Sequence, residues 1–237
     1  MNELSDRRLA WQPDIYQRYS FLARLTDILC GEHTGALTLL DVGSGPVALT
    51  EAFVSPRFDI VRADAGQFDD PSIVQLQPGK PLPFEDGAFD VAVAIEVLEH
   101  VPPAQRPTLI RELQRVSRQA TIVCCPINTP EVVEAERQFS AYAKAVSGRD
   151  VDFLVEHREN GLPDAAEVVS WFRPGSALVA DNAPLDEWLA FNTIDFIYAC
   201  DLGDDGAKAR FAAAINTRAP LTRAACAADV KAQKNRR

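Results

Sequence analysis

Short apolar runs, separated by turn residues and amphipathic stretches, mark the first half of the chain. The runs 37–40 and 91–95 are rich in apolar residues and stop next to a titratable residue, and a further predicted strand over 58–64 ends in an acid. Apolar runs of this length are typical of strands that are covered on both faces of a parallel sheet. Helical patterns between them complete an alternation that predicts an α/β fold.

Two glycines separate the first of these strands from a predicted helix over 48–54. The apolar run stops at Asp41, and Gly43 and Gly45 then permit a tight turn with close backbone approach to a ligand. A strand–glycine turn–helix unit holds adenosine-containing ligands at the carboxyl end of a parallel sheet. An ordinary strand-to-helix turn also fits two glycines, so the later chain decides between the two interpretations.

A second acid stands at the end of the strand 58–64. Asp64 lies 21 residues beyond Gly43, where a carboxylate can accept hydrogen bonds from both ribose hydroxyls of an adenosine. The alternative is that Asp64 simply begins a loop, where aspartate is common. A short third strand over 73–77 follows after a connection too short for a crossover helix, so this edge of the sheet is predicted to be abbreviated.

The rest of the chain is predicted to be largely helical. Residues 11–30 carry apolar positions at helical spacing and end at Gly31, while Thr129 and Pro130 form a good helix start. The further predicted elements are helices over 109–116, 129–147, 164–172, 184–198 and 207–215, a strand over 121–125, an edge strand over 177–180, a loop over 153–163 and a loose tail from 219.

Composition narrows the class of protein. The chain has 237 residues, 47% hydrophobic and 24% charged, which is ordinary for a globular protein. A formal net charge of -10 argues against a nucleic-acid backbone as the main partner. No apolar run approaches the ~18 residues of a membrane span, and residues 1–8 lack an apolar signal core, so we expect a cytoplasmic protein. Cys124 and Cys125 lie in a strand pattern and are predicted to be packed, reduced thiols.

Three motifs occur in order in the first half of the chain. They are Leu-Leu-Asp-Val-Gly-Ser-Gly at 39–45, Leu-Pro-Phe-Glu-Asp-Gly-Ala-Phe-Asp at 82–90 and Glu-Val-Leu-Glu-His-Val-Pro at 96–102. In this order and at these spacings they resemble class I S-adenosylmethionine-dependent methyltransferases. The resemblance continues more loosely over 126–188, where Glu-His-x-x-x-Gly-Leu-Pro-Asp at 156–164 is similar to bacterial methyltransferases associated with surface-glycan assembly.

This resemblance implies a fold and a domain organisation. The fold is a Rossmann-like, doubly wound, mostly parallel sheet with an abbreviated edge between the second and third strands and a helical C-terminal cap. The domain is a single one over 1–218, in which 11–30 is an N-terminal helix, 37–126 the cofactor-binding core and 127–218 the substrate or cap region, followed by a flexible tail over 219–237.

The resemblance also implies which residues contact the cofactor, S-adenosylmethionine. The residues around the glycine turn would surround its methionine part, Asp64 would bind the ribose, the 82–84 segment would line the adenine and Glu96 would border the sulfonium. Pro78 stands where an acid often contacts the adenine amino group, so a neighbouring glutamine would substitute. The predicted cofactor contacts are Asp41, Gly43, Ser44, Gly45, Asp64, Ala65, Gln77, Leu82, Pro83, Phe84 and Glu96.

Methyl transfer from a sulfonium is an in-line displacement, which requires alignment of the reactants and exclusion of water. If the acceptor is a hydroxyl, a nearby base helps to remove its proton, and histidine suits neutral pH. His100 and His157 are the candidate bases, with Glu99 beside them, although each histidine could instead make a structural hydrogen bond. We expect O-methylation of a sugar, glycan or small metabolite. The aromatic helix 184–198 could line an acceptor cavity, bury a homodimer interface or complete the core.

Three alternatives stay open. The run Glu96, Glu99, His100 could bind magnesium or manganese, but Glu99 could equally cap a helix, and no metal site is predicted. Gly43-x-Gly45-x-x-Ala48 also fits the dinucleotide fingerprint of an NAD(P)-binding oxidoreductase, although no Tyr-x-x-x-Lys dyad appears. A catalytically silent module that still binds S-adenosylmethionine is the third alternative. It is supported by two departures from the family pattern, Val47 in place of the third glycine of the loop and Pro78 in place of the acid.

Overall fold

A parallel sheet forms the centre of the protein. The computed structural model describes residues 8–31, 33, 35–180, 184–197 and 205–218. Within them, five strands lie in the order β3-β2-β1-β4-β5, and every neighbouring pair is parallel. The strands are β1 (Leu37–Val42), β2 (Phe58–Asp64), β3 (Ile73–Gln75), β4 (Phe89–Ile95) and β5 (Ser117–Cys124).

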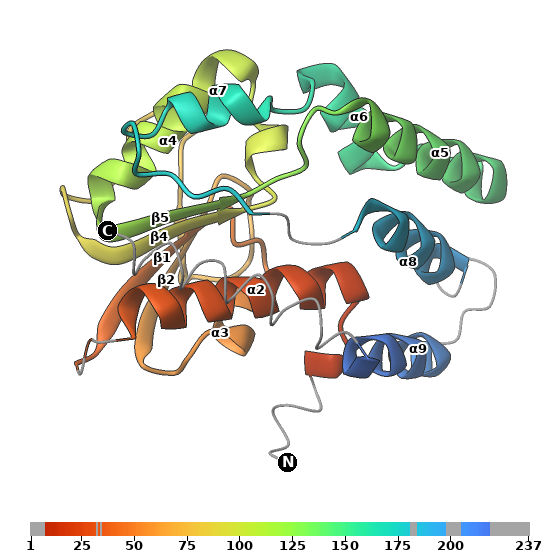
Figure 1. The fold of residues 1–237 in the computed structure, drawn as a ribbon, viewed down its shortest axis with the longest axis horizontal. Helices are drawn as coiled ribbons and strands as arrows, with labels where there is room; N and C mark the ends of the chain where they lie inside the picture. The colour runs from red at the N-terminus through yellow and green to blue at the C-terminus, as the bar shows by residue number, and fades with distance from the viewer. Residues whose placement is uncertain (1–7, 32, 34, 181–183, 198–204, 219–237) are drawn as a thin grey trace. The chain divides into compact units, whose positions relative to one another are not determined.

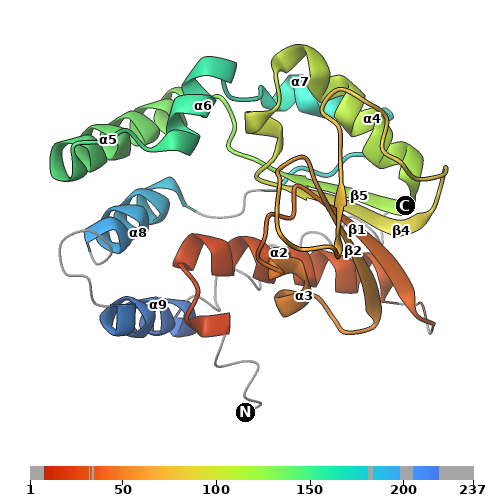
Figure 2. The ribbon, with the colours of Figure 1, turned by 180° about the vertical axis from the view of Figure 1, so that it is seen from behind.

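The strand order reverses between β1 and β4. The chain runs outward from β1 through β2 to β3, returns to β4 beside β1, and then runs outward again to β5. Helix α3 (Leu49–Phe53) connects β1 with β2, and α4 (Arg106–Val116) connects β4 with β5. Figures 1 and 2 show α3 on one face of the sheet and α4 on the other. This confirms the predicted Rossmann-like, doubly wound fold, and the three-residue β3, reached without a helix, confirms its abbreviated edge.

The core follows from the two periodicities of strand and helix. All seven residues of β4 are buried, and so are five of the six in β1. Alternate residues of a strand point to the same face of the sheet, and Leu40 and Ala92 lie on the face that α4 covers. The α4 residues that pack there recur every three positions. They are Ile110, Leu113 and Val116, each with no exposed surface.

Most predicted helices are present. They are α2 (Pro13–Cys30), α5 (Pro130–Ser147), α6 (Asp152–Asn160), α7 (Ala165–Ser170), α8 (Leu185–Ile197) and α9 (Asp205–Arg218), with short 3₁₀ turns η1 (Leu98–His100) and η2 (Pro103–Gln105). Thr129 caps α5 by accepting a hydrogen bond from the Val132 amide, and Gly148 ends it in the left-handed conformation. Helix α4 begins three residues before its predicted start, because Pro107 stands in the first turn, where its missing N–H is not needed.

Two sequence predictions were wrong. Residues 153–163 are not a loop, because α6 occupies most of them, with the Leu154 and His157 side chains turned inward at helical spacing. Only one of these two inward residues is apolar, so the segment shows no apolar helical pattern in the sequence. Residues 177–180 pair with no strand of the sheet, and Leu178 and Val179 are exposed. A four-residue apolar run alone does not specify a strand.

The chain divides into two compact units. One comprises Leu22–Asn128 and Glu156–Ala177 and contains the sheet; the remaining residues belong to the other. In the second unit α5 packs on α8, where the Phe139 ring meets the rings of Trp188 and Phe196 edge-on at centroid distances of 6.0 and 5.9 Å. The predicted single domain over 1–218 stays a prediction, and the predicted tail lies outside the described residues. None of the described helices combines the length and apolarity that crossing a bilayer would require.

Candidate functional site

The carboxyl ends of β1, β2 and β4 meet at one edge of the sheet. Because β1 pairs in parallel with both neighbours, the same edge holds three acids: Asp41 one residue before the end of β1, Asp64 at the end of β2 and Glu96 directly after β4. In a doubly wound sheet, ligands bind at this edge where the strand order reverses. The structure therefore brings the predicted glycine turn, the predicted ribose acid and the Glu96 motif to a single place.

The two glycines of the turn are required for different reasons. Gly43 has a φ of +76°, and a Cβ there would lie 2.3 Å from Cγ2 of Val97. Its amide donates to the Ala63 carbonyl at 2.8 Å, which anchors the turn to β2. Gly45 has a φ of +61°, but a Cβ there would meet no atom within 4 Å. Packing thus demands Gly43, whereas the open space beside Gly45 is available to a ligand.

Asp64 lies against the glycine turn. One of its carboxylate oxygens accepts from the Gly45 amide at 2.8 Å, and the other accepts from the Gly66 amide at 2.7 Å. A carboxylate oxygen has two lone pairs, so each can accept a further hydrogen bond from a hydroxyl. The carboxylate is thereby oriented before any ligand arrives. Its predicted ribose role stays a prediction.

Asp41 is a buried carboxyl group, with 2% of its surface exposed. Burial raises the pKa of Asp41 to about 6, and the negative charge of Asp64 acts in the same direction. A carboxylate removed from water is costly unless a positive charge compensates it. The site is therefore suited to a ligand that carries a cationic group, as the ammonium of a methionine moiety does.

Side chains of α4 hold the 82–84 segment in place through hydrogen bonds. The Leu82 amide donates to Glu112 at 2.8 Å, and the Arg115 guanidinium donates to the carbonyls of Leu82 and Phe84 at 3.0 and 2.8 Å. The side-chain hydrogen bond from Arg115 holds the pKa of Glu112 below its usual value. Leu82 is buried, and the Phe84 ring is half-buried, edge-on to Phe89 at 5.0 Å. Glu112 and Arg115 lie outside the three sequence motifs, on the later helix α4, and were not predicted as site residues.

Four further predicted contacts are less distinctive. Ser44 is buried, and its hydroxyl donates to the Gly45 carbonyl at 3.2 Å. Pro83, Ala65 and Gln77 are exposed. It is Gln75, not Gln77, whose side-chain amide bonds back to the end of β2, donating to the Ala65 carbonyl at 3.0 Å. The cofactor roles of these residues stay predictions.

Glu96 has a strained backbone. Its φ of +55° makes it the one non-glycine residue with positive φ among those the structure describes. Its amide donates to the Cys124 carbonyl at 2.8 Å, which continues the β4–β5 ladder into the strained position. Left-handed backbone at a side-chain-bearing residue is uncommon and gathers at functional sites. This signal could not be read from the sequence.

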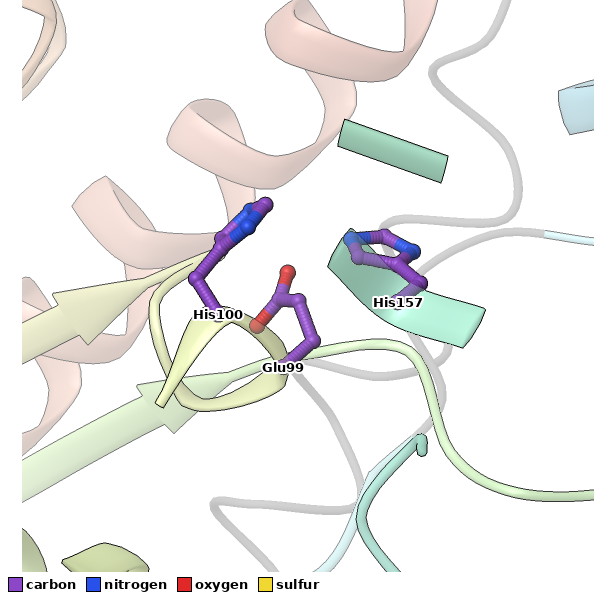
Figure 3. A group of neighbouring side chains, drawn as sticks. All are labelled: Glu99, His100 and His157. Carbon is purple, nitrogen blue, oxygen red and sulfur yellow. The ribbon is translucent and has the colours of Figure 1, made fainter. Parts of the chain in front are cut away.

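Glu99, His100 and His157 form a compact cluster. Figure 3 shows the Glu99 carboxylate directed toward the space between the two imidazoles. One potential ligand atom from each residue lies within 4.8 Å of the others, and the ring centroids are 5.0 Å apart. Glu99 and His157 are 0% and 5% exposed, whereas His100 is half-buried. The structure thus joins all three predicted catalytic residues, while Glu96, expected with them in an alternative metal site, is not part of the group.

Helix α6 and the segment after it hold the cluster together. The Asn160 side chain donates to the carbonyls of Glu99 and His100 at 3.4 and 3.1 Å. Arg106, 4% exposed, donates to the Val101 carbonyl at 2.9 Å and also bonds to the carbonyls of Asn160 and Gly161. These bonds tie the end of α6 to the turn after β4. The sequence prediction of a loop over 153–163 concealed this contact.

Glu156 orients the His100 ring. Its Oε2 lies 2.6 Å from His100 Nδ1, although the two residues are 56 positions apart. An ionised carboxylate can only accept, so Nδ1 carries the proton of this bond, and Nε2 of the neutral ring keeps its lone pair. Glu156 was not among the predicted site residues. Its place directly before His157 in the 156–164 motif is the one sequence signal that could have indicated it.

Cys30, Cys124 and Cys125 carry thiols and are not joined in disulfides. Burial raises the pKa of the Cys125 thiol well above its usual range, and the negative charges of Glu99 and Glu96 add to that effect. Cys125 is therefore protonated near neutral pH and is a poor nucleophile or metal ligand. This agrees with the expectation of a packed, reduced thiol.

Comparison with known proteins points to one family. A family model described as a methyltransferase domain matches residues 40–125, which run from β1 to the residue after β5. The chain is 31% identical over 172 residues to the 27-O-demethylrifamycin SV methyltransferase of Amycolatopsis mediterranei (strain S699), covering 67% of this chain and 61% of that protein. It is 35% identical over 96 residues to an uncharacterized methyltransferase of Mycobacterium sp. (strain KMS), covering 35% of this chain and 36% of that protein.

The chain therefore spans less than two thirds of the length of these relatives. Among solved structures, the YcgJ protein from Bacillus subtilis aligns with a TM-score of 0.45 and 17% identity, over 72% of this chain and 77% of that one.

The fold and the position of the site define a Rossmann-like α/β protein with a ligand-binding edge where β1 meets β4. Within that class, residues 40–125 match a methyltransferase domain, and the relatives that align with the chain are methyltransferases. This match agrees with the resemblance to S-adenosylmethionine-dependent methyltransferases drawn from the three motifs. The association with surface-glycan assembly stays a prediction.

Proposed function

We propose that the protein transfers a methyl group from S-adenosylmethionine to a hydroxyl oxygen of a sugar, glycan or other small metabolite. The observation that carries this proposal is the coincidence of two features at one sheet edge. The segment that matches a methyltransferase domain contains the glycine turn and Asp64, and directly after β4 it continues into the cluster around His100. One feature suits the methyl donor, and the other suits an acceptor that must lose a proton.

On the donor side, each polar contact has a partner on the cofactor. The Asp41 carboxyl group, with its raised pKa, would meet the ammonium of the methionine part, and binding that cation would favour its ionised form. Asp64, already oriented by two amides, would accept from the ribose hydroxyls. Leu82 and Phe84 offer apolar surface to the adenine.

On the acceptor side, a histidine removes the proton. The acceptor oxygen attacks the methyl carbon in line with the breaking sulfur–carbon bond, the electron pair of that bond returns to sulfur, and S-adenosylhomocysteine leaves. The hydroxyl proton passes to Nε2 of His100, whose other nitrogen donates to Glu156. His157, whose ring lies 5.0 Å away, is the alternative base. The relative from Amycolatopsis is named for methylation at an oxygen, which favours a hydroxyl acceptor.

The alternatives are not favoured. The family match is to a methyltransferase domain, so an NAD(P)-dependent oxidoreductase has no support beyond the glycine spacing. A silent binding module would have no need of the strained Glu96 or of the oriented imidazole. A cytoplasmic location and a possible homodimer remain predictions.

Calorimetry and methyl transfer test the proposal together. The purified chain is titrated with S-adenosylmethionine and, separately, with NAD; we expect binding of the first alone. Transfer of labelled methyl is then followed with a panel of nucleotide sugars, glycans and polyhydroxylated metabolites. Binding of NAD, or no binding of S-adenosylmethionine by the folded chain, would overturn the proposal. Binding without transfer to any acceptor would favour the silent module.

A further inference from the structure

The cluster of Glu99, His100 and His157 contains more donor groups than one base requires. We propose that it is a divalent transition-metal site, which binds an ion of the zinc, cobalt or nickel kind through one carboxylate oxygen and two imidazole nitrogens. Neither the family match nor the relatives assign a metal to this chain. The proposed ligand set also differs from the Glu96, Glu99, His100 alternative considered from the sequence, because it takes its third ligand from α6.

The distances leave little to close. The candidate ligand atoms of the three residues lie within 4.8 Å of one another. In a tetrahedral site with metal–donor bonds of about 2.1 Å, two ligand atoms lie about 3.4 Å apart. Inward movements of less than about 1 Å by each donor atom would therefore bring the three atoms around an ion.

Burial supports a cation at this position. Glu99 has no exposed surface, and His157 is 5% exposed. A carboxylate deep in a protein is costly in its ionised form, and an ion with two positive charges offsets that cost more fully than a neutral imidazole does.

Glu156 supplies the outer contact that metal-binding histidines usually have. Ligating imidazoles almost always donate their second nitrogen to a carboxylate or carbonyl, which sets the tautomer and turns the ring toward the ion. Here His100 Nδ1 donates to Glu156 at 2.6 Å, and Nε2 is left to bind metal. Asn160 and Arg106 add rigidity by bonding the two ligand-bearing segments to each other.

The donor types select the ion. Two imidazoles and one carboxylate suit zinc, cobalt, nickel and iron(II), whereas magnesium and calcium prefer oxygen ligands. Three protein ligands leave a coordination position open for water or for an oxygen of a small molecule. We therefore expect zinc to bind and millimolar magnesium not to displace it.

The binding of an ion does not depend on methyl transfer, but its consequence rests on the proposed function. The lone pair of His100 Nε2 cannot accept a proton and coordinate an ion in the same molecule. Zinc is therefore expected to inhibit methylation of a hydroxyl acceptor, and a chelator to restore it. An increase of the rate on adding zinc would show that His100 is not the base, and it would leave the metal site standing.

The experiment uses the full chain after treatment with a chelator and gel filtration. Zinc is titrated by calorimetry, and cobalt is titrated by its visible absorption, which reports nitrogen and oxygen ligands. We expect one ion per chain, with binding weakened at least tenfold in His157→Gln and in Glu99→Gln and about tenfold in Glu156→Gln. The matched controls, Glu159→Gln on the same helix and His33→Gln, should bind as the unmodified protein does; both residues are exposed.

The outcomes separate this inference from the proposed function. No stoichiometric zinc or cobalt binding by the folded chain, or binding that His157→Gln leaves unchanged, would overturn the metal site. If Glu99→Gln fails to fold, judged by circular dichroism, the half-buried His100→Gln takes its place. The same preparations are titrated with S-adenosylmethionine. If the chain binds S-adenosylmethionine but not zinc, only the metal site is overturned. If it binds zinc but not S-adenosylmethionine, only the methyltransferase proposal is overturned.

Discussion

The two sides of the site are built in opposite ways. On the donor side, the glycine turn and Asp64 are joined by backbone amides between neighbouring parallel strands. On the acceptor side, Glu99 and His100 meet His157 because side chains of a distant segment, chiefly Asn160, reach across. A turn that belongs to the sheet persists as long as the sheet does. A cluster that depends on the docking of α6 can be lost while the sheet survives.

This difference predicts that the two sides can be disabled separately. Where a turn residue is also packed, as Gly43 is, substitution should reduce stability and cofactor binding together. Substitutions around α6 should reduce methyl transfer and leave cofactor binding nearly unchanged. Four variants test that separation, beginning with the one expected to have the largest effect.

Gly43→Ala should be the most damaging. The new methyl group would overlap Cγ2 of Val97 at 2.3 Å, at a φ of +76°. We expect a loss of about 3 kcal/mol in the free energy of unfolding, from overpacking and backbone strain together. Urea denaturation measures that loss, and calorimetry should show S-adenosylmethionine binding weakened at least a hundredfold.

Gly45→Ala is the control for this comparison. Its φ of +61° costs about 1 kcal/mol in strain, but the added methyl group meets no neighbour. The protein should stay folded and lose affinity only. Equal destabilisation by the two substitutions would contradict the packing argument.

Asp41→Asn should stabilise the protein while weakening its binding of the cofactor. Since the pKa of Asp41 is raised to about 6, the folded state binds this proton more tightly than the unfolded state does. Ionising the buried Asp41 therefore lowers the free energy of unfolding. This loss is absent below about pH 4, grows as pH rises, and is complete above about pH 6, where it reaches about 3 kcal/mol. Thermal unfolding of the variant and the unmodified protein at pH 4 and pH 8 measures it.

The sign of the stability change in Asp41→Asn shows whether the ionised carboxylate destabilises or stabilises the ligand-free protein. A variant that gains stability at pH 8 and little at pH 4 agrees with a carboxylate that lacks its cationic partner in the ligand-free protein. A variant that is less stable at pH 8 would show that Asp41 contributes favourable interactions in its ionised form.

Arg106→Lys should break the acceptor side alone. Lysine cannot reproduce the fork that donates to the carbonyls of Val101, Asn160 and Gly161. We expect a loss of about 2 kcal/mol in stability and at least a tenfold fall in methyl transfer, with cofactor affinity within about twofold of normal. Arg111→Lys, exposed on the same helix, is the control and should change none of these quantities.

Glu156→Gln should have the smallest effect on stability. The ion pair with His100 is largely exposed at the glutamate end, so less than about 1 kcal/mol is at stake. Because an amide orients the ring less strongly, kcat should fall about tenfold while the affinity for S-adenosylmethionine stays the same. A fall in affinity with kcat unchanged would argue against a role for this residue in positioning the base.

The donor side of the site could be predicted from the sequence, whereas most of the acceptor side could not. The strand ends, the glycine turn and Asp64 could be located from the chain itself, because apolar runs and glycines act within a few residues of one another. Glu156, Asn160 and Arg106 could not, because each acts on a partner brought near by the fold. The helix that carries Glu156 was hidden by its polar composition, since His157, which it buries beside His100, is not an apolar residue.

The amino-acid sequence by itself determined the doubly wound sheet, its shortened edge and the methyltransferase motifs, because period, turn chemistry and strand length are local properties. Only the tertiary structure decided the conflict between Gly43 and Val97, the strained backbone of Glu96 and the meeting of Glu99 and His100 with His157. Those features depend on distances between segments that are remote along the chain, and no local pattern encodes such distances.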